Sequence, residues 1–242
     1  MRHVLLALAF LALAIPIPGN AASKDWGQDL PGIVRHIDAP ALALTFDACG
    51  GAYDACIIDL LRRENIPATL FIASPWMRRH PDTLRELAAD PLFEVAAHGL
   101  RHVPCSIDGK SAYGIRGTRS LAAAVKEAEG NVREIEAAIG RRPAWFRAGT
   151  AFYDAPAVDA IRALGLGIAG FSISGDGGAL LPPDKVAERT LGARPGDVLL
   201  FHFNHPESGT CAGLKKALPL LKERGTSFVR LSDVPGAANP PE

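Results

Sequence analysis

The stretch that decides the fold reads Ala41-Leu-Ala-Leu-Thr-Phe-Asp-Ala-Cys-Gly-Gly51. Its first six residues, 41–46, form a short apolar run of the kind that a buried strand of a parallel sheet produces. Asp47 ends this run, and two glycines then supply a turn. Polar residues that directly follow buried parallel strands are candidates for chemistry. Taken alone, however, an aspartate here more often caps the following loop.

Outward from this stretch, apolar runs typical of strands alternate with segments typical of helices. We expect strands at 41–46, 68–72, 93–97, 145–146, 168–171, 198–201 and 227–231, and helices at 54–63, 82–89, 120–139, 156–164, 183–191 and 214–223. The segment 103–119 has no clear period and predicts a long loop. Short strands separated by helices indicate parallel strands with right-handed crossovers. About seven such units without a linker predict an α/β fold that closes, or nearly closes, into a (β/α) barrel.

A doubly wound sheet that binds a nucleotide is the weaker alternative, because the sequence has no G-x-G-x-x-G and no Walker loop. The composition excludes other classes. The 242 residues are 48% hydrophobic, which is enough to bury a core and excludes collagen-like and strongly charged disordered chains. The 26 basic residues balance the 26 acidic ones. A net charge of zero means that the chain lacks the excess of basic residues expected of a protein that binds nucleic acid or anionic lipid.

The first 22 residues read as a targeting segment. Arg2 precedes an apolar run, 4–15, that is too short for a stable membrane span. Two prolines and small residues follow this run, which predicts a secretory signal peptide over 1–22 and export to the bacterial periplasm or beyond. An uncleaved membrane anchor is the alternative. We expect one domain over 23–236, with no membrane span after cleavage, and a frayed tail over 237–242.

Polar residues collect after the expected strands, on the rim where (β/α) barrels carry their active sites. In chain order they are Asp47, His98, His102, Arg147, Asp176, His202 and His205. Each has an ordinary structural explanation, such as a surface position for Arg147 or a buried, hydrogen-bonded position for His202. The set is more informative, because a carboxylate, a His-x-x-x-His pair, an arginine and a further histidine supply a base, a Lewis-acid site, an orienting cation and an acid. Those parts suit the hydrolysis of an amide or ester.

The four cysteines fit an oxidising compartment, where an even number permits disulfides. They are Cys49, Cys56, Cys105 and Cys211, and none forms a C-x-x-C motif. Four cysteines allow three connectivities. We expect Cys105–Cys211, since both lie just past histidines of the rim, with Cys49–Cys56 as the remaining pair.

The order and context of the rim motifs resemble those of the polysaccharide deacetylases, the NodB-like carbohydrate esterases of family four. The matching segments are Thr45-Phe-Asp-Ala48, His98-Gly-Leu-Arg-His102, Arg147-Ala-Gly-Thr150, Gly175-Asp176 and Leu199-Leu-Phe-His202. Together they span nearly all of the chain after residue 22. The resemblance implies a distorted (β/α) barrel, often with seven strands. It also implies a hydrolase that removes acetyl groups from N-acetylated or O-acetylated sugars, with an acetylated glycan as its partner.

The resemblance also implies catalytic roles. Asp47 corresponds to the general base and Arg147 to the cation that pairs with it. His202 corresponds to the general acid, and Asp176 to a carboxylate that tunes His202 or Arg147. A backbone N–H in the loop after Arg147, where Gly149 lets the chain approach closely, is expected to meet the oxyanion.

The metal site implied by the resemblance is incomplete. The family holds a divalent metal, often zinc, through both histidines of the second motif and the second aspartate of the first. His98 and His102 match those histidines, but Ala48 replaces the aspartate. Candidates to complete the site are Asp54, Cys49 and His205, or water. The alternative is weak or absent metal, as in the metal-independent amide hydrolases of this superfamily. The retained histidine pair favours metal.

The third motif also differs from the family pattern, because Ala-Gly-Thr follows Arg147 where the family has Pro and an aromatic residue. We expect Phe152 and Tyr153 to supply the missing apolar wall. The tryptophans Trp26, Trp76 and Trp145 could stack on sugars, but we expect a core position for at least two of them. A non-catalytic carbohydrate-binding relative and a metal-independent amide hydrolase remain as alternative functions. The glycan, the metal and the oligomeric state stay open.

Overall fold

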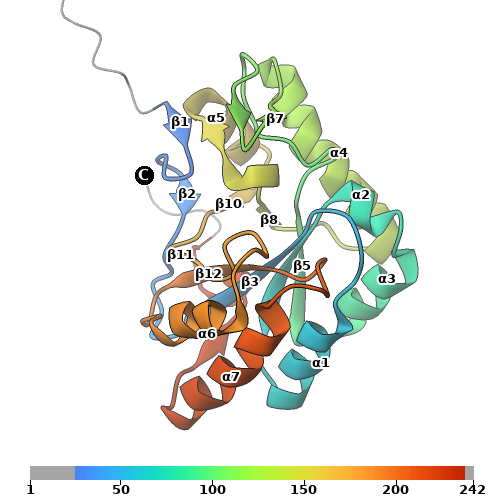
Figure 1. The fold of residues 1–242 in the computed structure, drawn as a ribbon. Helices are drawn as coiled ribbons and strands as arrows, with labels where there is room; N and C mark the ends of the chain where they lie inside the picture. Colours follow the sequence, from blue (N-terminus) through green and yellow to red (C-terminus); the bar gives the residue numbers. More distant parts are fainter. Residues whose placement is uncertain (1–24, 238–242) are drawn as a thin grey trace, which may run out of the picture.

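The computed structural model describes residues 25–237 and shows one mostly parallel sheet that curls into a half-barrel (Figure 1). Eight strands follow one another across it in the order β11 (Ile173–Ser174), β12 (Val198–His202), β3 (Leu42–Ala48), β4 (Ala68–Ile72), β5 (Phe93–Ala97), β8 (Trp145–Phe146), β10 (Gly167–Ala169) and β2 (Ile33–Val34). A ninth strand, β13 (Phe228–Val229), pairs beside β3. Every pairing within this sheet is parallel. The expected α/β fold, a distorted barrel of parallel strands, is confirmed. It has eight strands in sequence where about seven were expected, and it closes only halfway, with β11 and β2 at its two edges.

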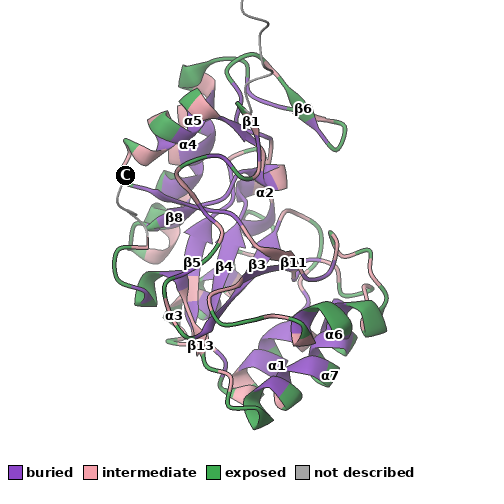
Figure 2. Cartoon of the chain, turned by 90° about the vertical axis from the view of Figure 1, so that its left-hand side faces the viewer, coloured by how far each residue is buried: buried purple, intermediate pink, exposed green. Residues whose placement is uncertain are grey.

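Helices cover the outer face of the sheet. They are α1 (Ala55–Glu64), α3 (Pro81–Ala89), α4 (Leu121–Ile139), α5 (Ala155–Arg162), α6 (Pro183–Leu191) and α7 (Thr210–Glu223). In Figure 2 their green outer surfaces contrast with the purple strands beneath, because each helix buries one face against the sheet. Local signals set their ends: the Ser120 side chain accepts a hydrogen bond from the backbone at the start of α4, and Gly140 ends it in the left-handed conformation.

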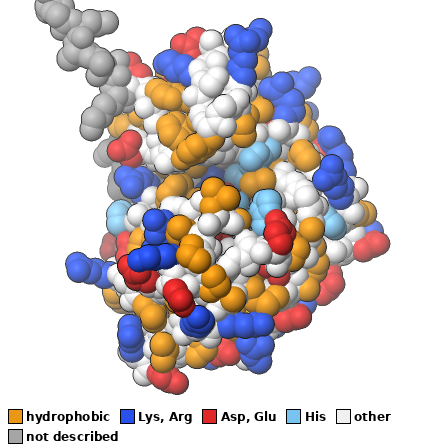
Figure 3. Space-filling model, viewed as in Figure 1, with side chains coloured by type: hydrophobic (Ala, Val, Ile, Leu, Met, Phe, Trp, Pro, Cys, Tyr) orange, Lys and Arg blue, Asp and Glu red, His pale blue; other side chains and the backbone are white. Residues whose placement is uncertain are grey.

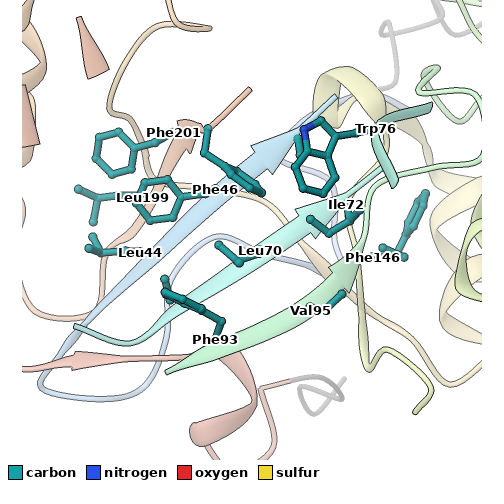
Figure 4. Packing of buried hydrophobic residues seen from close by; sticks show 14 of the residues in the cluster. Leu44, Phe46, Leu70, Ile72, Trp76, Phe93, Val95, Phe146, Leu199 and Phe201 are labelled. Carbon is teal, nitrogen blue, oxygen red and sulfur yellow. The ribbon is translucent and has the colours of Figure 1, made fainter. Parts of the chain in front are cut away.

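Side-chain alternation along the strands divides the core in two. Leu44 and Phe46 of β3 pack toward the helices with side chains from β4, β5 and β12 (Figure 4). Ala43, which precedes Leu44 and so points to the opposite face, belongs to a second cluster on the inner face. Leu231 and Val234, from the end of the chain, close that inner face. The amino-terminal half of the barrel is therefore filled, and polar inner-face residues lie at the carboxyl ends of the strands.

The structure contains elements that the sequence analysis missed. Within the expected loop 103–119, β6 (Ser111–Ala112) and β7 (Ile115–Arg116) form a short antiparallel hairpin. A one-turn helix, α2 (Ser74–Met77), follows β4, and a two-residue pair joins β1 (Trp26–Gly27) to β9 (Tyr153–Asp154). These elements are too short to leave a period in the sequence.

The described residues leave part of the expected organisation untested. The expected signal peptide, 1–22, lies outside them, as does the expected tail apart from Ala237, whose N–H bonds to Val234. Among residues 25–237, no helix is long and apolar enough to cross a membrane.

The expected disulfide pairing is wrong. Cys56 of α1 bonds to Cys211 of α7, with their Cα atoms 6.1 Å apart, while Cys49 and Cys105 are free thiols. Nearness to rim histidines in the sequence was a poor guide, because the bridge joins two adjacent helices on the outer face. Cys105 is fully buried in the core, and burial raises the pKa of its thiol well above the usual value.

The Cys56–Cys211 bridge closes a loop with a sequence separation of 155 residues. Breaking it should lower the free energy of unfolding by about 2–5 kcal/mol, because the unfolded chain regains the entropy of a long loop. Urea unfolding with and without dithiothreitol measures this loss. Dithiothreitol should not shift the midpoint of the Cys56→Ser/Cys211→Ser variant. Thiol titration of the denatured protein should count two free thiols, and a count of zero would contradict the pairing.

Candidate active site

Strand alternation brings the candidate residues together at one end of the barrel. Along β3, Thr45 and Asp47 follow Ala43 on the inner face, and the neighbouring strand β12 places His202 in register with Asp47. Arg147 directly follows β8. These side chains line or underlie a cavity of about 520 Å³ that opens at the carboxyl ends of the strands. In Figure 3, histidine side chains gather near the middle of the molecular face shown, with apolar side chains around them.

Arg147 is fully buried and ties the strands together below the cavity. Its guanidinium donates to Asp47 Oδ1 at 2.7 Å and to Thr45 Oγ1 at 3.0 Å. It also donates to the carbonyl oxygens of Ala169 at 3.2 Å and Gly170 at 2.8 Å. Its carbon Cζ lies 4.1 Å from the centre of the Phe71 ring. Arg147 thus uses four of its five N–H donors on these groups, and one of the four bonds is its ion pair with Asp47.

Asp47 is positioned to be an ionised base. Its second oxygen, Oδ2, lies 3.3 Å from His98 Nε2. Burial by itself raises the pKa of Asp47, but the Arg147 guanidinium and the neighbouring imidazoles of His98 and His202 outweigh it and hold the pKa below its usual value. The carboxylate is thus charged at neutral pH and has one oxygen directed toward the cavity.

His98 and His102 form a pair beside Asp47. Their ring centres are 4.7 Å apart. His98 Nδ1 donates to the carbonyl oxygen of Arg147 at 2.9 Å. Because a carbonyl only accepts, the neutral His98 ring carries its proton on Nδ1 and its lone pair on Nε2. His102 Nε2 is buried without a hydrogen-bond partner. His98 Nε2 and a ring nitrogen of His102 thus lie close together, as two imidazole ligands of one divalent metal do.

Residues 98–102 form a loop, called the histidine loop below. Two residues of α4 that the sequence analysis did not single out hold it in place. Asn131 Oδ1 accepts from the backbone N–H groups of His98 and Gly99 at 2.8 and 2.9 Å. One turn earlier, the buried Glu127 carboxylate accepts from the Arg101 backbone at 2.8 Å. Gly99 adopts a positive φ of 97°, and a Cβ there would lie 2.7 Å from Glu127 Oε1. The available signal was a pair of polar residues, four positions apart, beside the apolar stripe of a helix.

His202 and Asp176 form a second pair across the strands from the histidine loop. His202 Nδ1 donates to Asp176 Oδ1 at 3.0 Å, and the His202 backbone N–H donates to Asp176 Oδ2 at 2.6 Å. Asp176 therefore orients His202 and not Arg147. Burial by itself lowers the pKa of His202, but its interactions with Asp176 and Cys49 raise that pKa well above its usual value. The ring is then protonated at neutral pH, with Nε2 left for the cavity.

Of the three side chains suggested to replace the missing aspartate, only Cys49 lies at the histidine pair. Its Sγ is 3.6 Å from His98 Nε2. Asp54 instead caps α1 by accepting from the Cys56 backbone, and His205 pairs with Glu207 outside the cavity. Burial alone would raise the pKa of the Cys49 thiol, but the imidazoles of His102, His202 and His98 lower it well below its usual value. Asp54 and His205 are thus excluded as direct partners of this pair.

The cavity wall differs from the one expected. Tyr153 is buried, and its hydroxyl accepts from the Ala148 backbone N–H at 2.6 Å, while Phe152 packs between Trp26 and Tyr113. Neither lines the cavity. Its apolar wall comes instead from Tyr113, Ile115, Phe171, Leu180 and Leu200. Trp76 and Trp145 are fully buried in the core, as expected for two of the three tryptophans.

Gly149 serves the packing of two loops. A Cβ on this residue would lie 2.3 Å from the backbone carbonyl carbon of His102, closer than atoms can approach. The loop after Arg147 can therefore press against the histidine loop only with glycine at this position. Thr150 and Ala151, which follow, hold φ values of 83° and 57° and line the cavity.

Comparison with known proteins fits this arrangement. Residues 35–169, more than half of the chain, match the family model described as polysaccharide deacetylase. The chain belongs to the polysaccharide deacetylase family. The resemblance seen in the motifs is thereby confirmed, and the family is one of carbohydrate-acting hydrolases.

Individual relatives of this polysaccharide deacetylase family member are distant. The chain is 24% identical over 203 residues to a chitooligosaccharide deacetylase of Sinorhizobium fredii, covering 77% of this chain and 88% of that protein. A CE4 family pseudoenzyme from Bacillus anthracis superposes with a TM-score of 0.70 at 21% identity, over 82% of this chain and 66% of that one. A family 4 acetyl xylan esterase from Clostridium thermocellum, solved with a cobalt ion, gives 0.67 at 22% identity, over 80% and 89%. At such identities the structural likeness establishes the fold.

Replacing Asn131 by alanine should loosen the histidine loop without touching the cavity. The buried backbone N–H of Gly99 loses its acceptor, while that of His98 keeps its second acceptor, the Ile72 carbonyl oxygen at 3.1 Å. The free energy of unfolding should fall by about 1–3 kcal/mol. Urea unfolding measures this change. Lys126→Ala, on the exposed face of the same helix, is the matched control and should change stability by less than about 0.5 kcal/mol. An Asn131→Ala protein as stable as this control would show that the loop does not depend on α4.

Proposed function

We propose that this protein is an exported, metal-dependent deacetylase of acetylated carbohydrates that works by general acid–base catalysis. One observation carries the proposal: Asp47, held ionised by Arg147, faces the His98–His102 pair on one side and His202, its register partner, on the other. A base, a place for a cation and an acid thus surround one cavity.

Asp47 is the proposed general base. It takes a proton from the water that adds to the acetyl carbonyl carbon. The Arg147 ion pair keeps the carboxylate in the correct rotamer and charge state before the reaction, while Oδ2 stays directed at the cavity.

His202 is the proposed general acid. After water has added, the bond from the carbonyl carbon to the sugar nitrogen or oxygen breaks, and His202 gives its proton to the departing atom. Asp176 supports this role by holding Nδ1, so that Nε2 is the proton-bearing atom at the cavity. The products are acetate and the free amine or hydroxyl of the sugar.

The His98–His102 pair fits a divalent cation, because the neutral His98 ring has its lone pair on Nε2 and the buried His102 Nε2 has no hydrogen-bond partner. Such a cation, when bound, supplies a Lewis acid that polarises the acetyl carbonyl and acidifies the attacking water. A backbone N–H of residues 149–150 is the proposed second donor to the oxyanion. The Ala148 N–H does not serve, since it donates to Tyr153.

Export and substrate class complete the proposal. The signal-like sequence of residues 1–22 and the Cys56–Cys211 disulfide both suit an oxidising compartment outside the cytoplasm. An acetylated glycan suits a cavity of about 520 Å³ that combines a polar floor with apolar walls. A relative of 24% identity that acts on chitooligosaccharides makes N-acetylated oligosaccharides the first substrates to test.

Ala48 supports one competing function. A chain that lacks the aspartate expected at this position could be a non-catalytic carbohydrate-binding protein, and one structural relative is a pseudoenzyme. The buried Asp47–Arg147 pair and the oriented His202 favour catalysis, since binding alone does not require a poised base and acid together.

Asp47→Asn should reduce acetate release by about 10²- to 10⁴-fold, because asparagine cannot accept the proton. Asparagine keeps an oxygen that can accept from Arg147, and circular dichroism should show a folded protein. Acetate release from acetylated chitooligosaccharides is the measurement. Asp184→Asn, at a fully exposed site on α6, is the control and should retain full activity. Unchanged turnover by Asp47→Asn would remove Asp47 as the base.

Removal of metal gives a second, independent test. Dialysis against a strong chelator should abolish acetate release, and adding back zinc should restore it, because the proposed cation polarises the carbonyl. Activity that survives chelation, on glycans or on small cyclic amides, would favour the metal-independent alternative. No acetate release from any acetylated glycan, with zinc present, would favour the non-catalytic one.

A further inference from the structure

We propose that the thiolate of Cys49 is the third protein ligand of the metal in this chain, so that one sulfur and two imidazole nitrogens hold a thiophilic divalent cation. The proposal rests on the proposed function only in assuming a metal at His98 and His102. It assigns a ligand set in which Cys49 takes over from the missing carboxylate.

Strand alternation explains why position 49, and not position 48, reaches the site. Thr45 and Asp47 face the inside of the barrel, so the next inward position after them is 49. Ala48 packs with the hydrophobic cluster beneath the helices. A ligand is therefore missing at 48 but present one residue later, on the same side as Asp47.

The distances match a metal site. The ligand atoms of Cys49, His98 and His102 all lie within 4.8 Å of one another. Zinc holds sulfur at about 2.3 Å and imidazole nitrogen at about 2.0–2.1 Å, and a tetrahedral angle then separates sulfur from nitrogen by about 3.6 Å. Cys49 Sγ lies 3.6 Å from His98 Nε2. Among residues 25–237, the other such group is Asp54 with Cys56 and Cys211, whose sulfurs are joined in the disulfide.

The surroundings prepare the histidines for this role. The Arg147 carbonyl fixes the proton of the neutral His98 ring on Nδ1 and leaves the lone pair on Nε2, which lies 3.6 Å from Cys49 Sγ and 3.3 Å from Asp47 Oδ2. Hydrogen bonds to the side chains of Asn131 and Glu127 of α4 hold the loop that carries both histidines. Such outer partners orient a metal-binding imidazole. A ring nitrogen of His102, within 4.8 Å of the other two ligand atoms, completes the set.

Three protein ligands on the wall of a cavity leave one tetrahedral position open to substrate or water, the arrangement of catalytic zinc sites. A thiolate also changes which metals are accepted. Sulfur favours zinc and cobalt over magnesium, calcium and manganese, for which oxygen ligands are preferred. We therefore expect zinc or cobalt, and not magnesium or manganese, to load this site.

Cobalt substitution tests the ligand directly, without any substrate. Co²⁺ added to the metal-free full chain should produce a near-ultraviolet sulfur-to-cobalt charge-transfer band. Cys49→Ala and Cys49→Ser should lose this band and bind zinc at least about 10- to 100-fold more weakly. Cys105→Ala removes the other free thiol, which lies buried in the core, and should keep both the band and the affinity. Cys49→Asp, which restores a carboxylate near the pair, should bind cobalt without the band.

Other results would overturn the proposal. Cobalt binding to the wild type without a charge-transfer band would show that sulfur is not a ligand. Zinc affinity unchanged in Cys49→Ala would show the same, as would alkylation of Cys49 by iodoacetamide at the same rate with and without zinc. A band that is present while no acetylated glycan is hydrolysed would leave the ligand set intact and refute the proposed function alone.

Discussion

The buried contact between Arg147 and Asp47 is the interaction on which the rest of the site depends. A guanidinium with no exposure to solvent needs hydrogen-bond partners, and Arg147 has them on β3, at Ala169 of β10 and at Gly170. Removing one partner of such a pair typically costs about 3–5 kcal/mol, since the remaining charge stays buried. The same contact that joins distant strands also fixes the rotamer and the ionisation of Asp47.

Around this contact the active site is built from two supported imidazole groups. Polar side chains of α4 hold the loop of His98 and His102. Gly149 lets the loop after Arg147 pack closely against it. Asp176 holds His202 through both its ring and its backbone. The His98 and His202 rings are each oriented by a hydrogen bond at Nδ1. Support of this kind is what precise catalytic geometry requires.

Much of this could be predicted from the sequence. Alternating apolar runs and helical stripes located the main strands and the six long helices to within a few residues. The expectation that active-site residues follow the carboxyl ends of barrel strands predicted that five side chains lie close together. The structure does bring them together: Asp47, His98, His102, Arg147 and His202. Contacts that depend on helix packing could not be predicted. The Cys56–Cys211 bridge joins residues 155 positions apart, and the Asn131 bond to His98 joins residues 33 positions apart. No local pattern encodes these contacts or the cavity wall.

The sequence by itself determined the order of strands and helices, the family and the loss of a carboxylate at Ala48, since periodicity and motif spacing are local properties of the chain. Only the tertiary structure decided what stands in for that carboxylate. It showed that the Ala48 side chain lies among the helices and that the Cys49 sulfur lies against His98. The physical reason is that the direction of a side chain past the end of a strand, and its distance to a loop 49 residues away, follow from how the sheet curls and packs.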